Sequence, residues 1–164
     1  MTDYSVLDLV PVREGGTVSD AFSAATRLAQ TAEEVGCKRF WIAEHHAMQG
    51  IAGGATSVVL AHIGNATSTI RIGSGGIMLP NHSPLVIAEQ FGTLAALFPG
   101  RVELGLGRAP GSDQKVARAM RRDLMSGADS FPHDIQELQA YFAGDDRLGF
   151  QATPGAGENV PLWI

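Results

Sequence analysis

Residues that could transfer protons or bind a metal ion stand together in "EHH", Glu44 to His46, directly after an apolar run. A further histidine, His82, lies in "LPNHSP". Histidine titrates near neutral pH, with an ordinary pKa of about 6.5, and histidine and glutamate are both common metal ligands. Glu44, His45 and His82 are therefore candidate ligands. Because the sequence has no H-x-H or H-E-x-x-H spacing, we predict no metal site.

Two interpretations of His45 remain, a proton-transfer residue and a core histidine satisfied by hydrogen bonds. His45 and His46 are adjacent, so on an extended strand their side chains point to opposite faces, and only one of them can face the interior of a barrel. His62, inside an apolar helical pattern, and His133, near the start of a late helix, are expected to be structural.

Glycines crowd two segments, "GSGGIMLPNHSP" at 73–84 and "GLGRAPG" at 105–111. A dinucleotide-binding turn, G-x-G-x-x-G, follows the first strand and opens a helix. The first segment lies inside a strand-like run, and the second has Pro110 in place of the third glycine, so neither fits that turn. Glycine inside a strand marks a bulge, a tight bend or the close approach of a ligand. A flat ring lying on the main chain would need glycines such as Gly75 and Gly76.

Short apolar runs alternate with helical patterns along the chain, which indicates an α/β fold with a parallel sheet. In the first helix Thr17 or Ser19 is the expected cap and Gly36 the stop. Its expected apolar face carries Phe22, Ala25, Leu28, Ala32 and Val35. The expected strands are "SVLDLVPV", "RFWIAEHH", "IRIGSGGIML" and "RVELGLG", and the expected helices lie within residues 17–36, 55–66, 84–98, about 113–125 and about 135–142.

Two architectures fit this alternation, an open doubly wound sheet and a (β/α)₈ barrel that is cut short. A complete barrel takes about 250 residues, and the chain has 164. The final "VPLWI" has the composition of a buried strand, so we expect a truncated chain. In both architectures ligands bind at the carboxyl ends of the strands, where "EHH", the glycine pair and "GRAPG" would meet.

The composition, with 45% hydrophobic and 18% charged residues, is that of a globular domain with a core. The net charge of −5 gives no electrostatic support for nucleic-acid or anionic-membrane partners. No apolar run approaches the roughly 20 residues of a membrane span, and the start lacks the pattern of a signal peptide. We therefore expect a cytoplasmic protein. Cys37 is the single cysteine, which excludes an internal disulfide.

Three segments, "FWIAEHH", "RIGSGGIMLPNHSPLVIAEQFGTLAALFPGRVELGLGRAPGSDQ" and "VPLWI", together resemble the bacterial-luciferase-like flavin-dependent monooxygenases. The resemblance runs from the first strand to residue 164. It implies a (β/α)₈ TIM-barrel fold, truncated here to about the first four β/α units plus the start of strand five. Residues 1–164 would then be a single domain, the amino-terminal half of the barrel.

The resemblance also implies a cofactor and site residues. Family members use reduced FMN and molecular oxygen to oxygenate a small organic substrate, and a separate flavin reductase delivers the reduced FMN. Some members use a deazaflavin coenzyme instead. For this chain we expect FMN in preference to a deazaflavin. By motif position, Gly75 and Gly76 match a pair joined by a non-prolyl cis peptide bond beneath the isoalloxazine ring. His45 matches the active-site histidine, and Arg108 matches an arginine that meets the flavin phosphate.

The family continues for roughly another half barrel, including its phosphate-binding segment. The alternative function is therefore a catalytically inactive half-barrel that binds flavin weakly or acts as an assembly module. Exposed sheet edges and an uncovered inner face favour a homo-oligomer. The residues expected on that inner face are Val6, Ile42, Ile72, Ile77 and Leu104.

Overall fold

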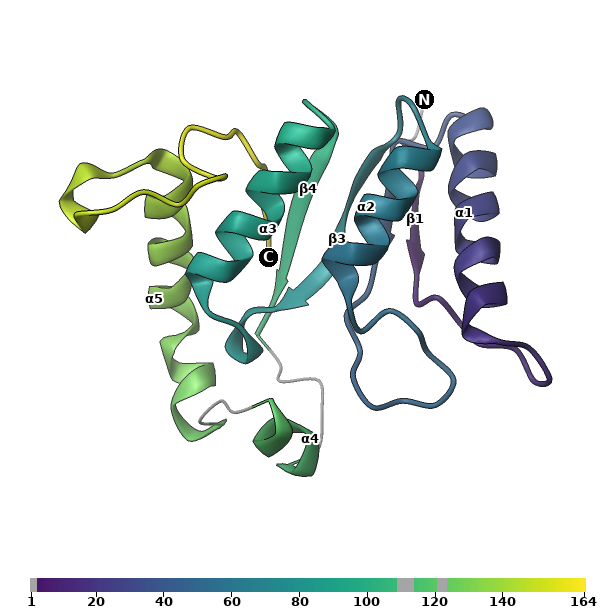
Figure 1. Cartoon of the computed structure of the whole chain (residues 1–164), viewed down its shortest axis with the longest axis horizontal. Coiled ribbons are helices and arrows are strands. Elements are labelled where there is room, and N and C mark those ends of the chain that lie inside the picture. Colours follow the sequence, from purple (N-terminus) through teal and green to yellow (C-terminus); the bar gives the residue numbers. More distant parts are fainter. Residues whose placement is uncertain (1–2, 109–113, 121–123) are drawn as a thin grey trace.

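A parallel sheet organises the chain, whose computed structural model describes residues 3–108, 114–120 and 124–164. The described strands form one five-stranded sheet in sequential order, β1-β2-β3-β4-β5 (Figure 1). Sequential winding is the arrangement of a (β/α)₈ barrel and differs from the reversing order of a doubly wound sheet. The prediction of an α/β fold of the (β/α)₈ barrel type is thus confirmed for the described strands. The strands are β1 (Ser5–Asp8), β2 (Arg39–Ile42), β3 (Arg71–Met78), β4 (Val102–Gly107) and β5 (Leu162–Trp163).

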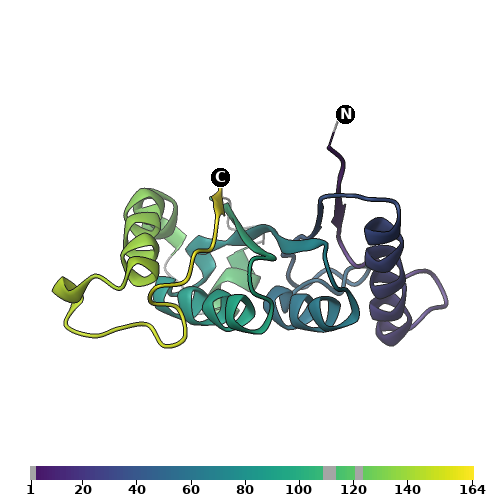
Figure 2. The same ribbon diagram turned by 90° about the horizontal axis from the view of Figure 1, so that it is seen from above.

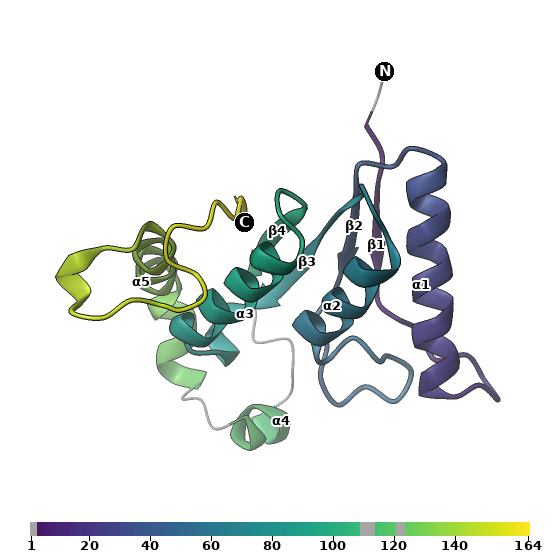
Figure 3. The same cartoon turned by 45° about the horizontal axis from the view of Figure 1, so that its top comes forward.

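Helices lie along one face of this sheet, and in the described chain no helix lies over the opposite face (Figure 2). After α5 the chain passes beside α3 before it enters the sheet as β5 (Figure 3). No helix of the described residues is long and apolar enough to cross a membrane. The helices are α1 (Val18–Glu34), α2 (Thr56–Ala66), α3 (Pro84–Leu97), α4 (Gln114–Ala119) and α5 (Leu124–Ala143), with short 3₁₀ turns η1 (Leu79–Asn81) and η2 (Asp146–Leu148).

Local sequence signals place α1 well and its buried face in part, since Ala25 and Ala32 are buried as expected. Thr17, not Ser19, is the cap: its hydroxyl accepts from the N–H of Asp20 at 3.1 Å, and the Asp20 carboxylate accepts from the N–H of Thr17 at 2.9 Å. The buried stripe consists of small side chains, Ala21, Ala25, Ala29 and Ala32. Leu28 and Val35, expected on that face, are exposed. The alanine stripe lets the helix lie close to its neighbours.

The apolar core lies between the sheet and the helices. Strand residues Phe40, Ile42, Ile72 and Leu104 are fully buried there, together with Leu60 and Ile63 of α2 and Ile87 and Phe91 of α3. A methyl group built on Gly64 of α2 would lie 2.8 Å from Cδ1 of Ile72, so that side chain points at the helix. The prediction that Val6, Ile42, Ile72, Ile77 and Leu104 line the barrel interior is therefore wrong, since all five belong to this core or pack against it. Barrel strands have apolar residues on their helix-facing side as well, and alternation alone does not say which side is which.

The opposite face of the sheet carries charged and aromatic side chains. Glu103 is 1% exposed there and accepts from Arg39 Nε at 2.8 Å and from Arg71 Nε at 2.5 Å. Trp41 donates its indole N–H to the same carboxylate at 3.3 Å. Trp163 of β5 packs edge-on against Trp41, with ring centroids 5.7 Å apart. The face of the sheet that would form the interior of a barrel therefore carries charged and aromatic side chains at these positions, and not a continuous aliphatic layer.

Glu33, at the end of α1, holds the turn that leads into β3. Its carboxylate accepts hydrogen bonds from the backbone N–H groups of Ser68, Thr69 and Ile70 and from the Thr69 hydroxyl. Burial acts to raise the pKa of Glu33, but these hydrogen bonds outweigh burial and lower the pKa from 4.5 to about 2. The ionised carboxylate therefore stabilises the folded state.

We predict that Glu33→Gln lowers the free energy of unfolding at pH 7 by about 1–2 kcal/mol, because hydrogen bonds to a charged acceptor are lost. The folded-state pKa is depressed, so the contribution is full above about pH 4.5 and is lost as the pH falls towards about 2. Urea unfolding across this range should show the two proteins converging at low pH. Glu34→Gln, at the exposed neighbouring position, is the control; an equal loss in both variants would contradict this role of Glu33.

Candidate active site

The candidate site lies where β3 approaches β4. Ser74 pairs with Leu104 and Ile77 pairs with Leu106, so β3 holds one extra residue between these pairs, a β-bulge. The bulge contains Gly75 and Gly76, and the peptide bond between them is cis, as the resemblance implied.

The glycines of the bulge are required by close backbone approach. A Cβ on Gly76 would lie 2.9 Å from the carbonyl carbon of Gly105, and a Cβ on Gly105 would lie 2.2 Å from the carbonyl oxygen of Ser74. Neither obstacle is a side chain that can rotate away. At Gly75 the obstacles are side chains, with Leu7 Cδ1 at 2.7 Å and Trp41 Cε3 at 2.9 Å.

A hollow of about 270 Å³ opens over these glycines on the uncovered face of the sheet. Its lining includes Gly75, Gly76 and Gly105, here called the glycine floor, and the aromatic residues Trp41 and Trp163. A floor without side chains between aromatic walls suits a planar ring system. The lining residues are Leu7, Trp41, Gly75, Gly76, Gly105, Leu106, Trp163 and Ile164.

His45 follows β2 at the same end of the sheet but is not part of this lining. Its side chain is half-buried, and its Nδ1 atom is buried with no hydrogen-bond partner among the described residues. The core-histidine interpretation, in which hydrogen bonds satisfy the ring, does not hold for this atom. A buried polar atom without a partner is costly, so Nδ1 can gain from a polar group that enters the site.

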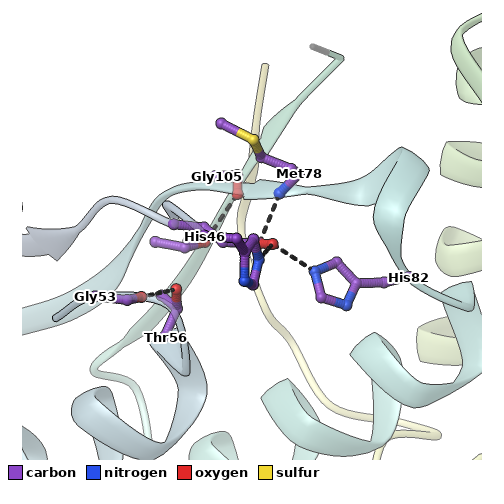
Figure 4. Close-up of polar contacts among 8 residues, drawn as sticks. His46, Gly53, Thr56, Met78, His82 and Gly105 are labelled. Atoms are coloured by element: carbon purple, nitrogen blue, oxygen red, sulfur yellow. Dashed lines mark hydrogen bonds and ion pairs between the residues drawn. The ribbon is translucent and has the colours of Figure 1, made fainter. Parts of the chain in front are cut away.

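A buried carboxylate beside His45 joins two other histidines. Oε1 of Glu44 accepts from Nε2 of His46 at 2.5 Å and from Nε2 of His82 at 2.7 Å, while Oε2 accepts from the N–H of Met78 at 2.8 Å (Figure 4). Burial acts to raise the pKa of Glu44. The hydrogen bond and the charge of His82, together with the hydrogen bonds from His46 and from the N–H of Met78, outweigh burial and lower the pKa.

The grouping of His45 with Glu44 and His82, predicted from the sequence, is therefore wrong. His46, not His45, completes the cluster, because residues two apart on an extended segment lie on the same side. The E-x-H spacing of Glu44 and His46 was the available signal. His62, expected to be structural, is exposed on α2. His133 is also exposed.

Arg108 follows β4 directly and its side chain is exposed at the carboxyl end of the sheet. The structure thus puts it at the same end as His45 and the glycine pair, but outside the lining of the hollow. Residues 109–111, the rest of the "GLGRAPG" segment with Pro110, lie outside the described residues. The role of Arg108 at a flavin phosphate stays a prediction.

Comparison with known proteins gives a consistent family. A family model described as luciferase-like monooxygenase matches residues 2–155. A protein of Escherichia coli (strain K12) named luciferase-like monooxygenase is 52% identical over 169 aligned residues, which cover 100% of this chain and 50% of the relative. The chain therefore spans about half the length of this relative.

Solved structures agree. The crystal structure of apo-MsnO8 superposes with a TM-score of 0.93 at 39% identity, covering 99% of this chain and 49% of that one. A more distant structure, at 18% identity and TM-score 0.74, shares the fold over 87% of this chain and 40% of its own. It is the oxygenating constituent of 3,6-diketocamphane monooxygenase from the CAM plasmid of Pseudomonas putida, a type II Baeyer–Villiger monooxygenase, in complex with FMN.

We predict that Gly76→Ala destabilises the fold by about 1–3 kcal/mol, the usual cost of overpacking, because the new methyl group meets backbone of β4. Gly75→Ala should cost less, since Leu7 and Trp41 can shift. Gly50→Ala, at a glycine with no atom within 4 Å of its added methyl group, is the control. Chemical unfolding measures all three; a Gly76→Ala protein as stable as Gly50→Ala would refute the packing argument.

Proposed function

Because the chain belongs to the luciferase-like monooxygenase family, we propose that its glycine-floored hollow binds a flavin ring for the oxidation of a small organic substrate by molecular oxygen. Residues 1–164 are, in this proposal, the amino-terminal half of a luciferase-like barrel. The observation that carries the proposal is the hollow lined by Trp41, Trp163 and the backbone of glycines, of which Gly76 and Gly105 lie too close to neighbouring backbone to carry a Cβ.

FMN is the flavin we propose, in preference to a deazaflavin. The FMN-bound monooxygenase of similar fold supports this choice. Reduced FMN, when bound, supplies the electrons for the reaction with oxygen, and a flavin reductase is its proposed source. The chain's own part is to bind and orient the ring: the backbone of Gly75 and Gly76 forms the floor, and the two indoles exclude water from the face they cover. Arg108 is the proposed partner of the phosphate.

His45 is the proposed proton-transfer residue. Its Nδ1 atom is buried and lacks a partner among the described residues, so it is available to hold or deliver a proton at a bound ligand. The adjacent Glu44, bonded to the N–H of Met78, fixes the segment that carries His45 relative to β3. His45 thus acts from a backbone that is tied to the strand holding the glycine floor.

The uncovered face of the sheet needs a partner in this proposal. Leu7, Trp163 and Ile164 are large apolar residues on or beside the hollow and are all exposed. Burial of such surface is worth about 25 cal/mol per Å². In the relatives, which are about twice as long as this chain, further sequence is present; for residues 1–164 alone we propose a homo-oligomer.

We predict that FMN binds the chain and that its fluorescence changes on titration. The protein's two tryptophans both line the hollow, so their emission should be quenched as well. Trp41→Ala should weaken binding about 10-fold, because stacking on an aromatic ring contributes about 1–3 kcal/mol. Tyr4→Ala, which removes an exposed aromatic ring elsewhere, should bind normally. If FMN keeps its free fluorescence and the tryptophan emission does not change, the inactive half-barrel is favoured instead.

We predict that His45→Ala reduces turnover about 100-fold, the lower range for general acid–base catalysis, without loss of melting temperature. Turnover is measured as substrate-dependent oxygen consumption with FMN and a flavin reductase, in the assembly that binds FMN. His62→Ala, which removes an exposed histidine on α2, is the matched control and should retain full turnover. Loss of melting temperature with unchanged turnover per folded protein would assign His45 a structural role.

A further inference from the structure

Glu44, His46 and His82 form a compact donor cluster, and the flavin proposal gives no role to its two histidines or to the Glu44 oxygen that faces them. One ligand atom from each lies within 4.8 Å of the others. We infer that this cluster is a binding site for a divalent transition-metal ion, and specifically for Zn²⁺. The inference replaces the expectation of no metal site, which depended on local spacing. The three-dimensional cluster joins residues that are 38 positions apart in the sequence.

The donor set matches zinc. Two imidazole nitrogens and one carboxylate oxygen are the protein ligands of many four-coordinate zinc sites in which water takes the fourth position. Here both imidazoles present the same atom, Nε2, and both aim at the same oxygen, Oε1 of Glu44. Glu44 is 1% exposed, and hydrogen bonds from Met78 and both histidines stabilise its ionised carboxylate. The negative charge therefore lies next to two nitrogen ligands and is poorly solvated.

The cluster is almost at the size that zinc requires. With ligand distances of about 2.0–2.1 Å, the ligand atoms of a tetrahedral zinc lie about 3.3 Å apart. Because the Nε2–Oε1 distances are 2.5 Å for His46 and 2.7 Å for His82, the two Nε2 atoms must withdraw from Oε1 by roughly 0.8 and 0.6 Å. His46 and His82 can do so, because both lie outside the helices and main strands, and their side chains are 21% and 23% exposed. Glu44 stays in place, since its other oxygen accepts from Met78.

A free coordination position is also available. Glu44 and His82 line a small pocket of about 200 Å³ on the helix side of the sheet, between the start of α2 and α3, with Thr56 and Gln90 in its wall. Water in this pocket can take the fourth position. The pocket shares no lining residue with the hollow over Gly75 and Gly76. Zinc binding is therefore separate from flavin binding, and each can succeed or fail independently.

The test is titration of the metal-free chain with Zn²⁺ by calorimetry, together with Co²⁺ as a spectroscopic probe. We expect one saturable site in the micromolar range and the intense visible bands of tetrahedral cobalt. His46→Ala and His82→Ala should each weaken zinc binding by at least about 100-fold, because loss of a ligand exceeds the 10–100-fold cost of losing an outer hydrogen-bond partner. His62→Ala should bind zinc normally.

A second group of possible ligands, His133, Asp134 and Glu137 on α5, provides a stricter control. If His133→Ala abolishes zinc binding and the His46 and His82 variants retain it, the assignment is wrong. A measurement on the unmodified chain covers the case in which a variant does not fold. Zn²⁺ should protect His46 and His82, and not His62, from modification by diethyl pyrocarbonate, as read by peptide mass spectrometry. Absence of saturable zinc binding, or absence of this protection, would overturn the inference.

Discussion

The backbone contact between β3 and β4 is the constraint on which the rest of the site depends. Gly105 meets Ser74 and Gly76 main chain to main chain, at distances that leave no room for a Cβ on Gly76 or Gly105. Because no side chain stands there, the uncovered face has a bare floor, and the bulge shifts the register between Ser74 and Ile77. That bulge brings Met78 into reach of Glu44, which ties the end of β2 to the end of β3.

The two faces of the sheet have different chemistry for a physical reason. The helix-facing side is sealed by apolar packing, so its strand positions carry Phe40, Ile72 and similar residues. The uncovered side holds the Glu103 carboxylate between two arginines, an arrangement in which removal of one partner would leave a charge buried without compensation. A partner that covers this side must accept the exposed parts of both guanidinium groups and of the tryptophan pair. Relatives twice as long as this chain have further sequence that could meet this need.

Histidines at the carboxyl end of the sheet divide into two kinds by their surroundings. His46 and His82 donate to a buried carboxylate, whereas Nδ1 of His45 has no partner in the described part of the chain. The adjacent residues His45 and His46 thus have different environments. That of His46 suits a fixed charge or a metal ion, and that of His45 suits proton exchange with a ligand. The environment of His46 and His82 is set by the buried Glu44 carboxylate, to which both rings are hydrogen-bonded.

The sequence alone determined what depends on near neighbours. Alternation of apolar runs and helical patterns predicts the parallel α/β fold. Thr17 or Ser19 predicts the start of α1, and the glycine pair inside a strand predicts a bulge, a tight bend or the close approach of a ligand at Gly75 and Gly76. Sequential strand order, the face on which Ile42 and Ile72 are buried, and the choice of His46 over His45 were decided only by the tertiary structure. A period of two along a strand defines two faces but not which of them the helices cover. That choice depends on contacts between residues far apart in the chain, such as Gly64 with Ile72 and Glu44 with His82.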